Sequence, residues 1–103
     1  ESFGLIALEA WAAHRPVVLG DIPAVRSFIR PGEDAELVAP TDAAGLAAVL
    51  GELLDDPDRC RRLAVAGHAE IAERFAWERV CDAWDGVLRA LAPSACAVER
   101  AVP

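Results

Sequence analysis

The first twenty residues, "ESFGLIALEAWAAHRPVVLG" (1–20), decide the fold. In the stretch 3–13 the only charged residue is Glu9, so this stretch predicts a helix that is apolar on nearly every side and buried over most of its surface. Ser2 stands where it could cap that helix. The helix must end before the proline that opens "PVVLG" (16–20), and this apolar run predicts a short strand buried on both faces, as in parallel sheets. A helix leading into a buried strand is half of a βαβ unit.

The rest of the chain predicts a second strand and then three helices. Residues 24–29 predict a short helical turn, "RPGED" (30–34) a tight turn and "AELVA" (35–39) a second short strand. The next helix is capped by Thr41 or Asp42, and another starts at Asp56-Pro57, an N-cap followed by proline at the first helical position. Apolar residues recur at helical spacing in three stripes: Leu46, Val49, Leu50, Leu53, Leu54; Cys60, Leu63, Ala64, Gly67, Ile71; and, within 75–91, Val80, Cys81, Trp84, Val87, Leu88, Leu91.

Composition narrows the possible classes of protein. The 103 residues are enough for one small domain or part of one, and ten basic against seventeen acidic residues give a net charge of −7, which argues against a nucleic-acid surface. No apolar run approaches the ~18 residues of a membrane span, and the first residues do not form a signal peptide. We expect reduced cytoplasmic thiols at Cys60, Cys81 and Cys96, the first two packed in helices.

The chain is expected to be incomplete as a folding unit. It contains no Met, so residue 1 is not expected to be a translation start. Two short strands do not make a stable parallel sheet by themselves, and the apolar first helix needs partners that this chain hardly supplies. We therefore predict the C-terminal part of an α/β domain over residues 1–91, ending in three helices, and a loose C-terminal tail over 92–103.

Two glutamates, Glu1 and Glu9, flank the apolar opening segment. Eight residues of helix advance by roughly 800° and ~12 Å, so the two carboxylates cannot share a proton. If the helix starts near Ser2, the amides of Phe3, Gly4 and Leu5 are left without helical partners and favour a phosphate. Carboxylates beside such a site suit sugar hydroxyls. The alternative is that Glu1 is a solvated loop residue and Glu9 a helix-surface residue with no role in binding.

The segment "ESFGLIALEAWAAHRPVV" resembles the E-x7-E region of retaining glycosyltransferases of the GT-B fold, family 4. Further elements of that family follow in order, namely "DIP", "PGE", "LVAPTD", "DPDR" and "FAWE", so the resemblance covers roughly residues 1–91. It implies the C-terminal part of a Rossmann-like nucleotide-sugar-binding domain. It also implies transfer of a sugar from a nucleotide-sugar to an acceptor with retention of anomeric configuration.

The resemblance assigns roles residue by residue. Glu1 would contact hydroxyls of the donor sugar at the catalytic centre, the amides of Phe3 and Gly4 would hold that sugar, and Leu5 would face the diphosphate. Glu9 would accept hydrogen bonds from the ribose. The expected substrate-binding set is Glu1, Ser2, Phe3, Gly4, Leu5 and Glu9.

The resemblance also implies what the enzyme binds. It predicts no metal and no cofactor besides the donor, and it does not specify the acceptor, which could be a glycan, a lipid or a small molecule. A missing N-terminal domain of the same chain would complete the site and provide any membrane association. By itself the segment should be inactive.

The sequence departs from the family pattern at several positions. His14 stands where glycine is usual at the helix end, and a left-handed conformation there would cost a histidine on the order of 1 kcal/mol. Ser27, Ala35, Glu36 and Ala76 also differ. The three tryptophans, Trp11, Trp77 and Trp84, are expected to be core residues or inter-domain anchors.

Two other functions remain open. One is a degenerate GT-B protein that binds a nucleotide-sugar or a partner without catalysis. The other is a helical protein-interaction module, with 42–91 as its working part and the opening motif accidental.

Overall fold

The computed structural model describes residues 2–92, so Glu1, Cys96 and nearly all of the predicted tail (92–103) lie outside the described residues. The order of elements is the predicted one of helix, strand, helical turn, strand and further helices. The elements are α1 (Leu5–Ala12), β1 (Val18–Gly20), α2 (Pro23–Arg26), β2 (Glu36–Val38), α3 (Ala43–Asp55), α4 (Pro57–Glu70), the π-helical turn η1 (Ile71–Phe75) and α5 (Trp77–Leu91).

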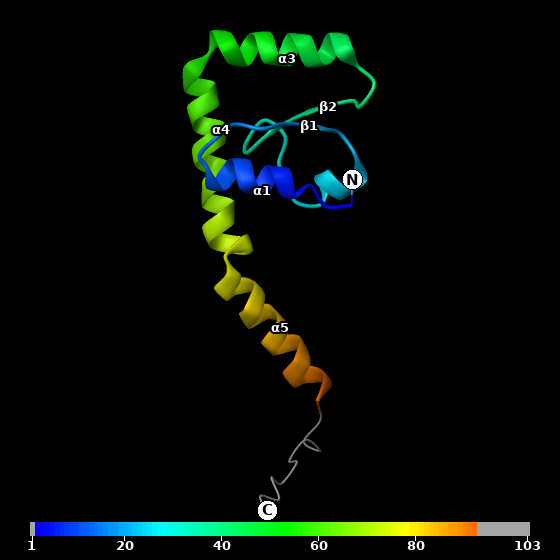
Figure 1. Cartoon of the computed structure of the whole chain (residues 1–103), viewed down its shortest axis with the longest axis vertical. Helices are drawn as coiled ribbons and strands as arrows, with labels where there is room; N and C mark the ends of the chain where they lie inside the picture. The colour runs from blue at the N-terminus through cyan, green and yellow to red at the C-terminus, as the bar shows by residue number, and fades with distance from the viewer. Residues whose placement is uncertain (1, 93–103) are drawn as a thin grey trace, which may run out of the picture.

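The two strands run parallel, as a helix leading into an apolar strand predicts. The prediction that the first strand is buried on both faces is wrong in this chain, because Val18 and Leu19 are half-buried and Gly20 is exposed where the described residues supply no further strand to cover them. Leu19 pairs with Leu37, and Gly20 with Val38. Helix α1 runs opposite to the strands, so its N-terminus lies at the same side as the end of β1 (Figure 1). The described residues contain only this two-stranded sheet.

The core lies where α1, the sheet and α4 meet around Trp11, which is fully buried. The Trp11 indole Nε1 donates a hydrogen bond to the Asp34 carbonyl at 3.0 Å. A Cβ added at Gly67 of α4 would come within 2.2 Å of the indole ring, so this glycine is what lets α4 approach Trp11. The other buried apolar residues of this cluster are Ala7, Val17, Val25, Phe28, Ile29 and Ala35.

One prediction about α1 is wrong in this chain. Only one face of the helix is buried, through Ala7 and Trp11, whereas Leu5 and Ile6 are 64% and 61% exposed. The apolar sequence therefore predicted the helix correctly, but this chain supplies packing partners for only one face of it.

The caps of α3 and α4 confirm the predicted helix starts. Asp42, rather than Thr41, caps α3 by accepting a hydrogen bond from the Gly45 amide at 2.8 Å. Asp56 caps α4 by accepting from the Arg59 amide at 2.8 Å, with Pro57 at the first helical position. The predicted stripe of α4 is largely buried, whereas most of the α3 stripe is exposed apart from Leu53.

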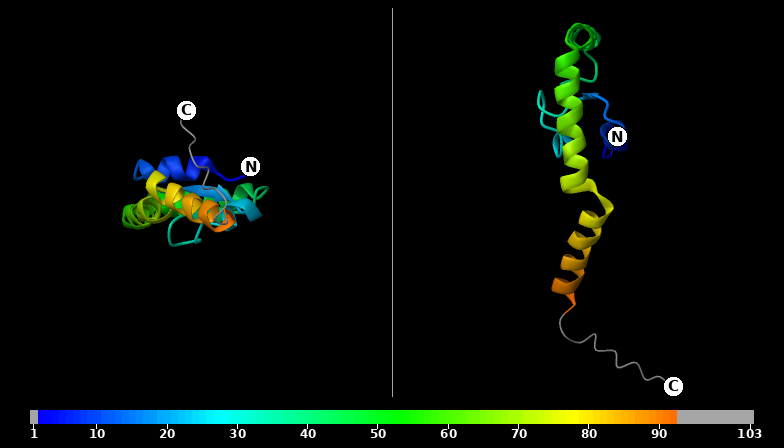
Figure 2. Two further views of the ribbon diagram at one scale, coloured as in Figure 1. Left: turned by 90° about the horizontal axis from the view of Figure 1, so that it is seen from below. Right: turned by 90° about the vertical axis from the view of Figure 1, so that its left-hand side faces the viewer.

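Helix α5 extends away from the rest of the protein (Figure 2). Its start is set by Ala76, whose extended backbone (φ −59°, ψ 140°) interrupts the helical run after η1. The predicted apolar stripe is present, but none of α5 is buried. Trp77 and Trp84 are 74% and 62% exposed and are not core residues of this chain. Cys81, expected to be packed, is exposed, whereas Cys60 is half-buried and both are free thiols.

His14 has the left-handed backbone expected for its position, with φ 53°. Its ring stacks on His68 of α4 with 3.6 Å between ring centroids. His68 Nδ1 lies 3.1 Å from the Trp11 carbonyl. The end of α1 is thus fastened to α4.

Candidate functional site

The candidate site lies at the N-terminal end of α1. Because α1 runs opposite to the parallel strands, this end shares an edge with the carboxyl ends of β1 and β2 (Figure 1). In open parallel sheets, ligands bind at the carboxyl edge. The predicted residues Ser2, Phe3, Gly4 and Leu5 are therefore together at the edge where a ligand is expected, while Glu1 lies outside the described residues.

Gly4, and not Ser2, is the N-cap of α1. Its backbone is left-handed, with φ 96° and ψ 48°, a conformation that favours glycine. No side chain among residues 2–92 caps the helix by a hydrogen bond. The prediction that Ser2 caps the helix is wrong because the chain turns sharply at Gly4 before the helix begins.

Glu9 lies one helical turn into α1, on the face that also carries Leu5 at i−4. It is exposed, and its carboxylate has no hydrogen-bond or ion-pair partner among residues 2–92. The four residues between Leu5 and Glu9 correspond to about 6 Å along the axis. A ligand lying along this exposed face could thus reach both the helix start and the Glu9 carboxylate.

Two aromatic residues that the sequence patterns did not single out, Phe28 and Phe75, pack next to Phe3 and the Gly4 turn. The Phe3 ring stacks on Phe28 with 4.9 Å between centroids. Phe75 of η1 meets Phe28 edge-on at 5.9 Å and Phe3 at 6.1 Å. These three phenylalanines lie far apart in the sequence, so no local periodicity could have grouped them.

A charged pair also occupies the region directly after β1. The Arg26 guanidinium donates to both carboxylate oxygens of Asp21, with Nη2 2.5 Å from Oδ2. The hydrogen bond from Arg26 holds the pKa of the Asp21 carboxyl below its usual value. The pair braces the loop between β1 and α2, and α2 supplies Val25, which packs near Gly4.

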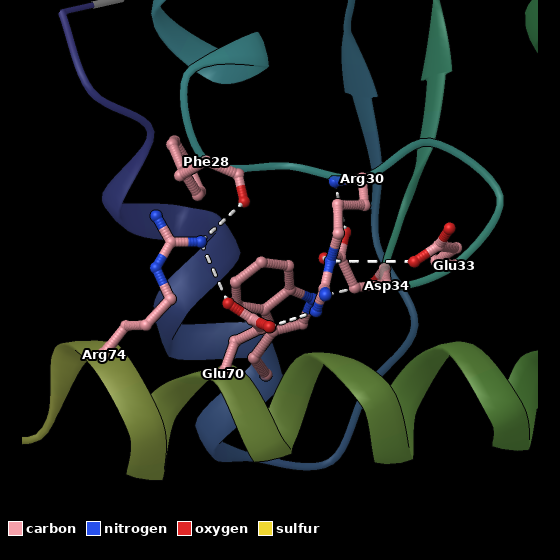
Figure 3. Close-up of polar contacts among 7 residues, drawn as sticks. Phe28, Arg30, Glu33, Asp34, Glu70 and Arg74 are labelled. Atoms are coloured by element: carbon pink, nitrogen blue, oxygen red, sulfur yellow. Dashed lines mark hydrogen bonds and ion pairs between the residues drawn. The ribbon is translucent and has the colours of Figure 1, made fainter.

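A network of ion pairs joins the loop before β2 to α4 and η1 (Figure 3). Asp34, fully buried, accepts from the Arg30 amide at 2.9 Å and from Arg30 Nε at 3.2 Å. Arg30 also pairs with Glu70 of α4, whose other oxygen lies 3.0 Å from Arg74 Nη1. Both buried carboxylates are therefore fully paired, and the network has a structural role rather than a free acid or base.

Other features of the described residues are less suited to a polar ligand. A hollow of about 340 Å³ lies between the strand ends and α3, lined largely by apolar residues.

Within residues 2–92 no group of three or more His, Cys, Asp or Glu side chains is placed to hold a metal ion. No helix in this part is both long and apolar enough to cross a membrane.

Comparison with known proteins gives a consistent result. Residues 1–69 match the family model described as glycosyl transferases group 1. The glycogen synthase of Mycobacterium tuberculosis is 40% identical over 83 residues, which are 81% of this chain and 20% of that protein. The chain thus spans about a fifth of the curated relatives it matches.

Two solved structures resemble the fold. Sucrose-phosphate synthase from Thermosynechococcus elongatus superimposes with a TM-score of 0.81 at 33% identity, over 88% of this chain and 23% of that one. HepE from Anabaena, in complex with UDP-glucose, superimposes with a TM-score of 0.81 over 87% of this chain and 25% of that one. At 21% identity the second match supports the fold alone.

Proposed function

The chain belongs to the group 1 family of glycosyl transferases and has the fold of the C-terminal GT-B segment, and from this premise we propose that it forms the donor side of a complete glycosyltransferase. That enzyme transfers a sugar from a nucleotide-sugar to an acceptor with retention of anomeric configuration. The observation that carries the proposal is the start of α1 at Gly4, where no side chain of residues 2–92 caps the helix, followed on the same helix by the Glu9 carboxylate, which has no partner among those residues.

The diphosphate, the ribose and the sugar of a nucleotide-sugar each have a candidate group in this segment of the chain. The positive end of the α1 dipole and the amides of Leu5 and Ile6 at its start suit the diphosphate. The Glu9 carboxylate, further along the exposed face, suits the ribose hydroxyls as a pure acceptor. Glu1, which precedes the turn in sequence, would take the sugar hydroxyls, and the amides of Phe3 and Gly4 would hold the same sugar.

The mechanism that follows is electrostatic. Cleavage of the bond between sugar and diphosphate leaves negative charge on the diphosphate, and the start of α1 at Leu5 stabilises that charge with oriented amides. Positive charge develops on the sugar ring, where a carboxylate at Glu1 would be favourable. Basic residues of the remaining polypeptide would assist the leaving group, and no metal ion is required in this scheme.

The family match disfavours a helical interaction module with an accidental opening motif, because the match begins at residue 1 and runs to residue 69. A degenerate protein that binds the donor without catalysis makes a different prediction from an enzyme. Both would bind a nucleoside diphosphate, but only the enzyme would consume the nucleotide-sugar.

The test uses the complete polypeptide that carries this chain. Calorimetry with UDP, GDP and ADP should detect binding of at least one nucleoside diphosphate, and NMR should detect transfer or slow hydrolysis of the matching nucleotide-sugar with retained anomeric configuration. The Glu1→Gln variant should lose most of its kcat and bind the free nucleoside diphosphate as before, because that product lacks the sugar. Absence of nucleotide binding by the wild-type protein would refute the proposed function.

A further inference from the structure

The Gly4 turn rests on an aromatic surface formed by Phe28 and Phe75. A Cβ placed at Gly4 would lie 3.5 Å from Phe28 Cζ and 3.6 Å from Val25 Cγ2, so the glycine backbone already lies close to these side chains. Phe3, on the other side of the turn, stacks on the same Phe28 ring with an interplanar angle of 17°. The position of the Phe28 ring therefore determines where the backbone before α1 can lie.

Phe28 is itself held by Arg74. The Arg74 guanidinium Nη1 lies 3.4 Å from the Phe28 carbonyl oxygen and 3.0 Å from Glu70 Oε2. Its Cζ lies 5.1 Å from the centroid of the Phe75 ring, within the range of a cation–π contact. One guanidinium thus contacts the backbone of Phe28 and the ring of Phe75, the two residues that form the aromatic surface. Figure 3 shows its contacts with the Phe28 carbonyl and with Glu70.

The guanidinium is fixed in turn by Glu70. The Glu70 carboxylate is only 4% exposed, and its second oxygen pairs with Arg30. A buried carboxylate held from two sides has little freedom to move, so the Arg74 side chain that pairs with it has a defined position. The chain of contacts runs from α4 through Arg74 and Phe28 to the Gly4 turn.

We propose that Arg74 is a positioning residue for the donor site, acting through the Phe28 ring on the Gly4 turn. This inference rests on the proposed function, because it assigns to the turn the task of presenting amides to the diphosphate. Displacement of reacting groups by about 1 Å can cost on the order of 100-fold in rate, and binding groups need similar support from the residues around them. Arg74 provides that support without touching the donor.

Arg89 supplies a control for the loss of a helix ion pair. It pairs with Asp85 at i,i+4 across 2.6 Å on α5, as Arg74 pairs with Glu70 at i,i+4. Both partners on α5 are exposed, whereas the Glu70 side chain is only 5% exposed, so Arg74→Ala also leaves a buried carboxylate with one partner fewer. Arg89→Ala therefore controls for the ion pair alone, and the thermal midpoints of both variants show whether Arg74→Ala acts through stability.

The experiment measures nucleoside diphosphate affinity by calorimetry in the complete polypeptide, with UDP, GDP or ADP, whichever the wild-type protein binds. We expect Arg74→Ala to weaken binding by about 3- to 10-fold, the size of one lost hydrogen bond, and Arg89→Ala to leave it within twofold. Phe28→Leu should weaken binding as well. The double variant Arg74→Ala/Phe28→Leu should lose less than the product of the two single effects, because Arg74 then has no ring to position.

The outcomes separate failure of the positioning role of Arg74 from failure of the proposed function. Wild-type affinity in the folded Arg74→Ala variant, or multiplicative effects in the double variant, would overturn the positioning role while leaving the proposed function intact. No nucleotide binding by the wild-type protein would instead refute the proposed function. If Arg74→Ala does not fold, Arg74→Met keeps the apolar part of the side chain but removes its charge and its donors, and an unchanged affinity in that variant would also overturn the inference.

Discussion

Replacement of Glu9 by alanine separates ligand binding from folding more cleanly than any other change at the candidate site. The Glu9 carboxylate is exposed and has no partner among residues 2–92, so its removal breaks no contact of the described fold. Alanine also has the highest helix propensity. We therefore expect the thermal midpoint of the Glu9→Ala protein to match or slightly exceed that of the wild type.

The binding effect should be large by comparison. Hydrogen bonds to a charged group are worth about 1.5–3 kcal/mol when one partner is removed, which corresponds to a loss of about 10- to 150-fold in nucleotide affinity. Calorimetry on the complete polypeptide measures this directly. Glu78→Ala, an exposed carboxylate in the first turn of α5, is the control and should bind as the wild type does.

The ribose assignment can be tested from the ligand side as well. If Glu9 accepts from ribose hydroxyls, the wild-type protein should bind the 2′- or 3′-deoxynucleotide more weakly than the ribonucleotide. The Glu9→Ala protein should show a much smaller preference between them. An unchanged dissociation constant, or an equal loss for ribo- and deoxynucleotides, would refute the assignment of Glu9 to the ribose.

Three further predictions concern the fold. Gly67→Ala in the complete polypeptide should destabilise it by about 1–3 kcal/mol in urea unfolding, because the new methyl group meets the Trp11 ring; unchanged stability would mean that Trp11 can move. The pKa of the Asp21 carboxyl is lower in the folded than in the unfolded state. Its ion pair with Arg26 therefore stabilises the fold above the ordinary carboxyl pKa of about 4, and this stabilisation is lost as the pH falls through the lower pKa of the folded state. Asp21→Asn should therefore be less stable than the wild type near pH 7 and approach it below roughly pH 4, and a gap independent of pH would contradict this. The isolated chain should be oligomeric or melt without cooperativity, because α5 leaves its apolar stripe uncovered; sedimentation as a monomer with a sharp melt would show the reverse.

The sequence predicted local structure well where local chemistry determines it. Proline and aspartate fixed the starts of α3 and α4, at Asp42 and at Asp56-Pro57, because a cap needs only its own helix. The parallel arrangement followed from the short apolar run at 16–20, which comes directly after a helix. Burial was harder to predict, since apolar residues such as Leu5 and Trp84 face solvent where the chain supplies nothing to cover them.

The candidate site shows the same division. The motif predicted that Gly4 and Glu9 belong to one ligand-facing helix, and their spacing alone determines how far apart they lie. The sequence did not predict the left-handed cap at Gly4 or the aromatic residues behind it, because Phe28 and Phe75 reach the turn only through tertiary packing. Contacts between distant segments have no local pattern from which they could be read.

The exposed face of α1 is best understood together with its uncapped start. A solvent-exposed surface with Leu5, Ile6 and a carboxylate that has no partner among residues 2–92 is unusual for a helix whose other side holds the largest fully buried side chain of the core. Trp11 anchors the inner side through Asp34 and Gly67, so the helix cannot rotate to hide its apolar residues. A rigidly held helix with an open N-terminus meets the requirement of a preorganised anion site, in which the amides are already oriented before the ligand binds.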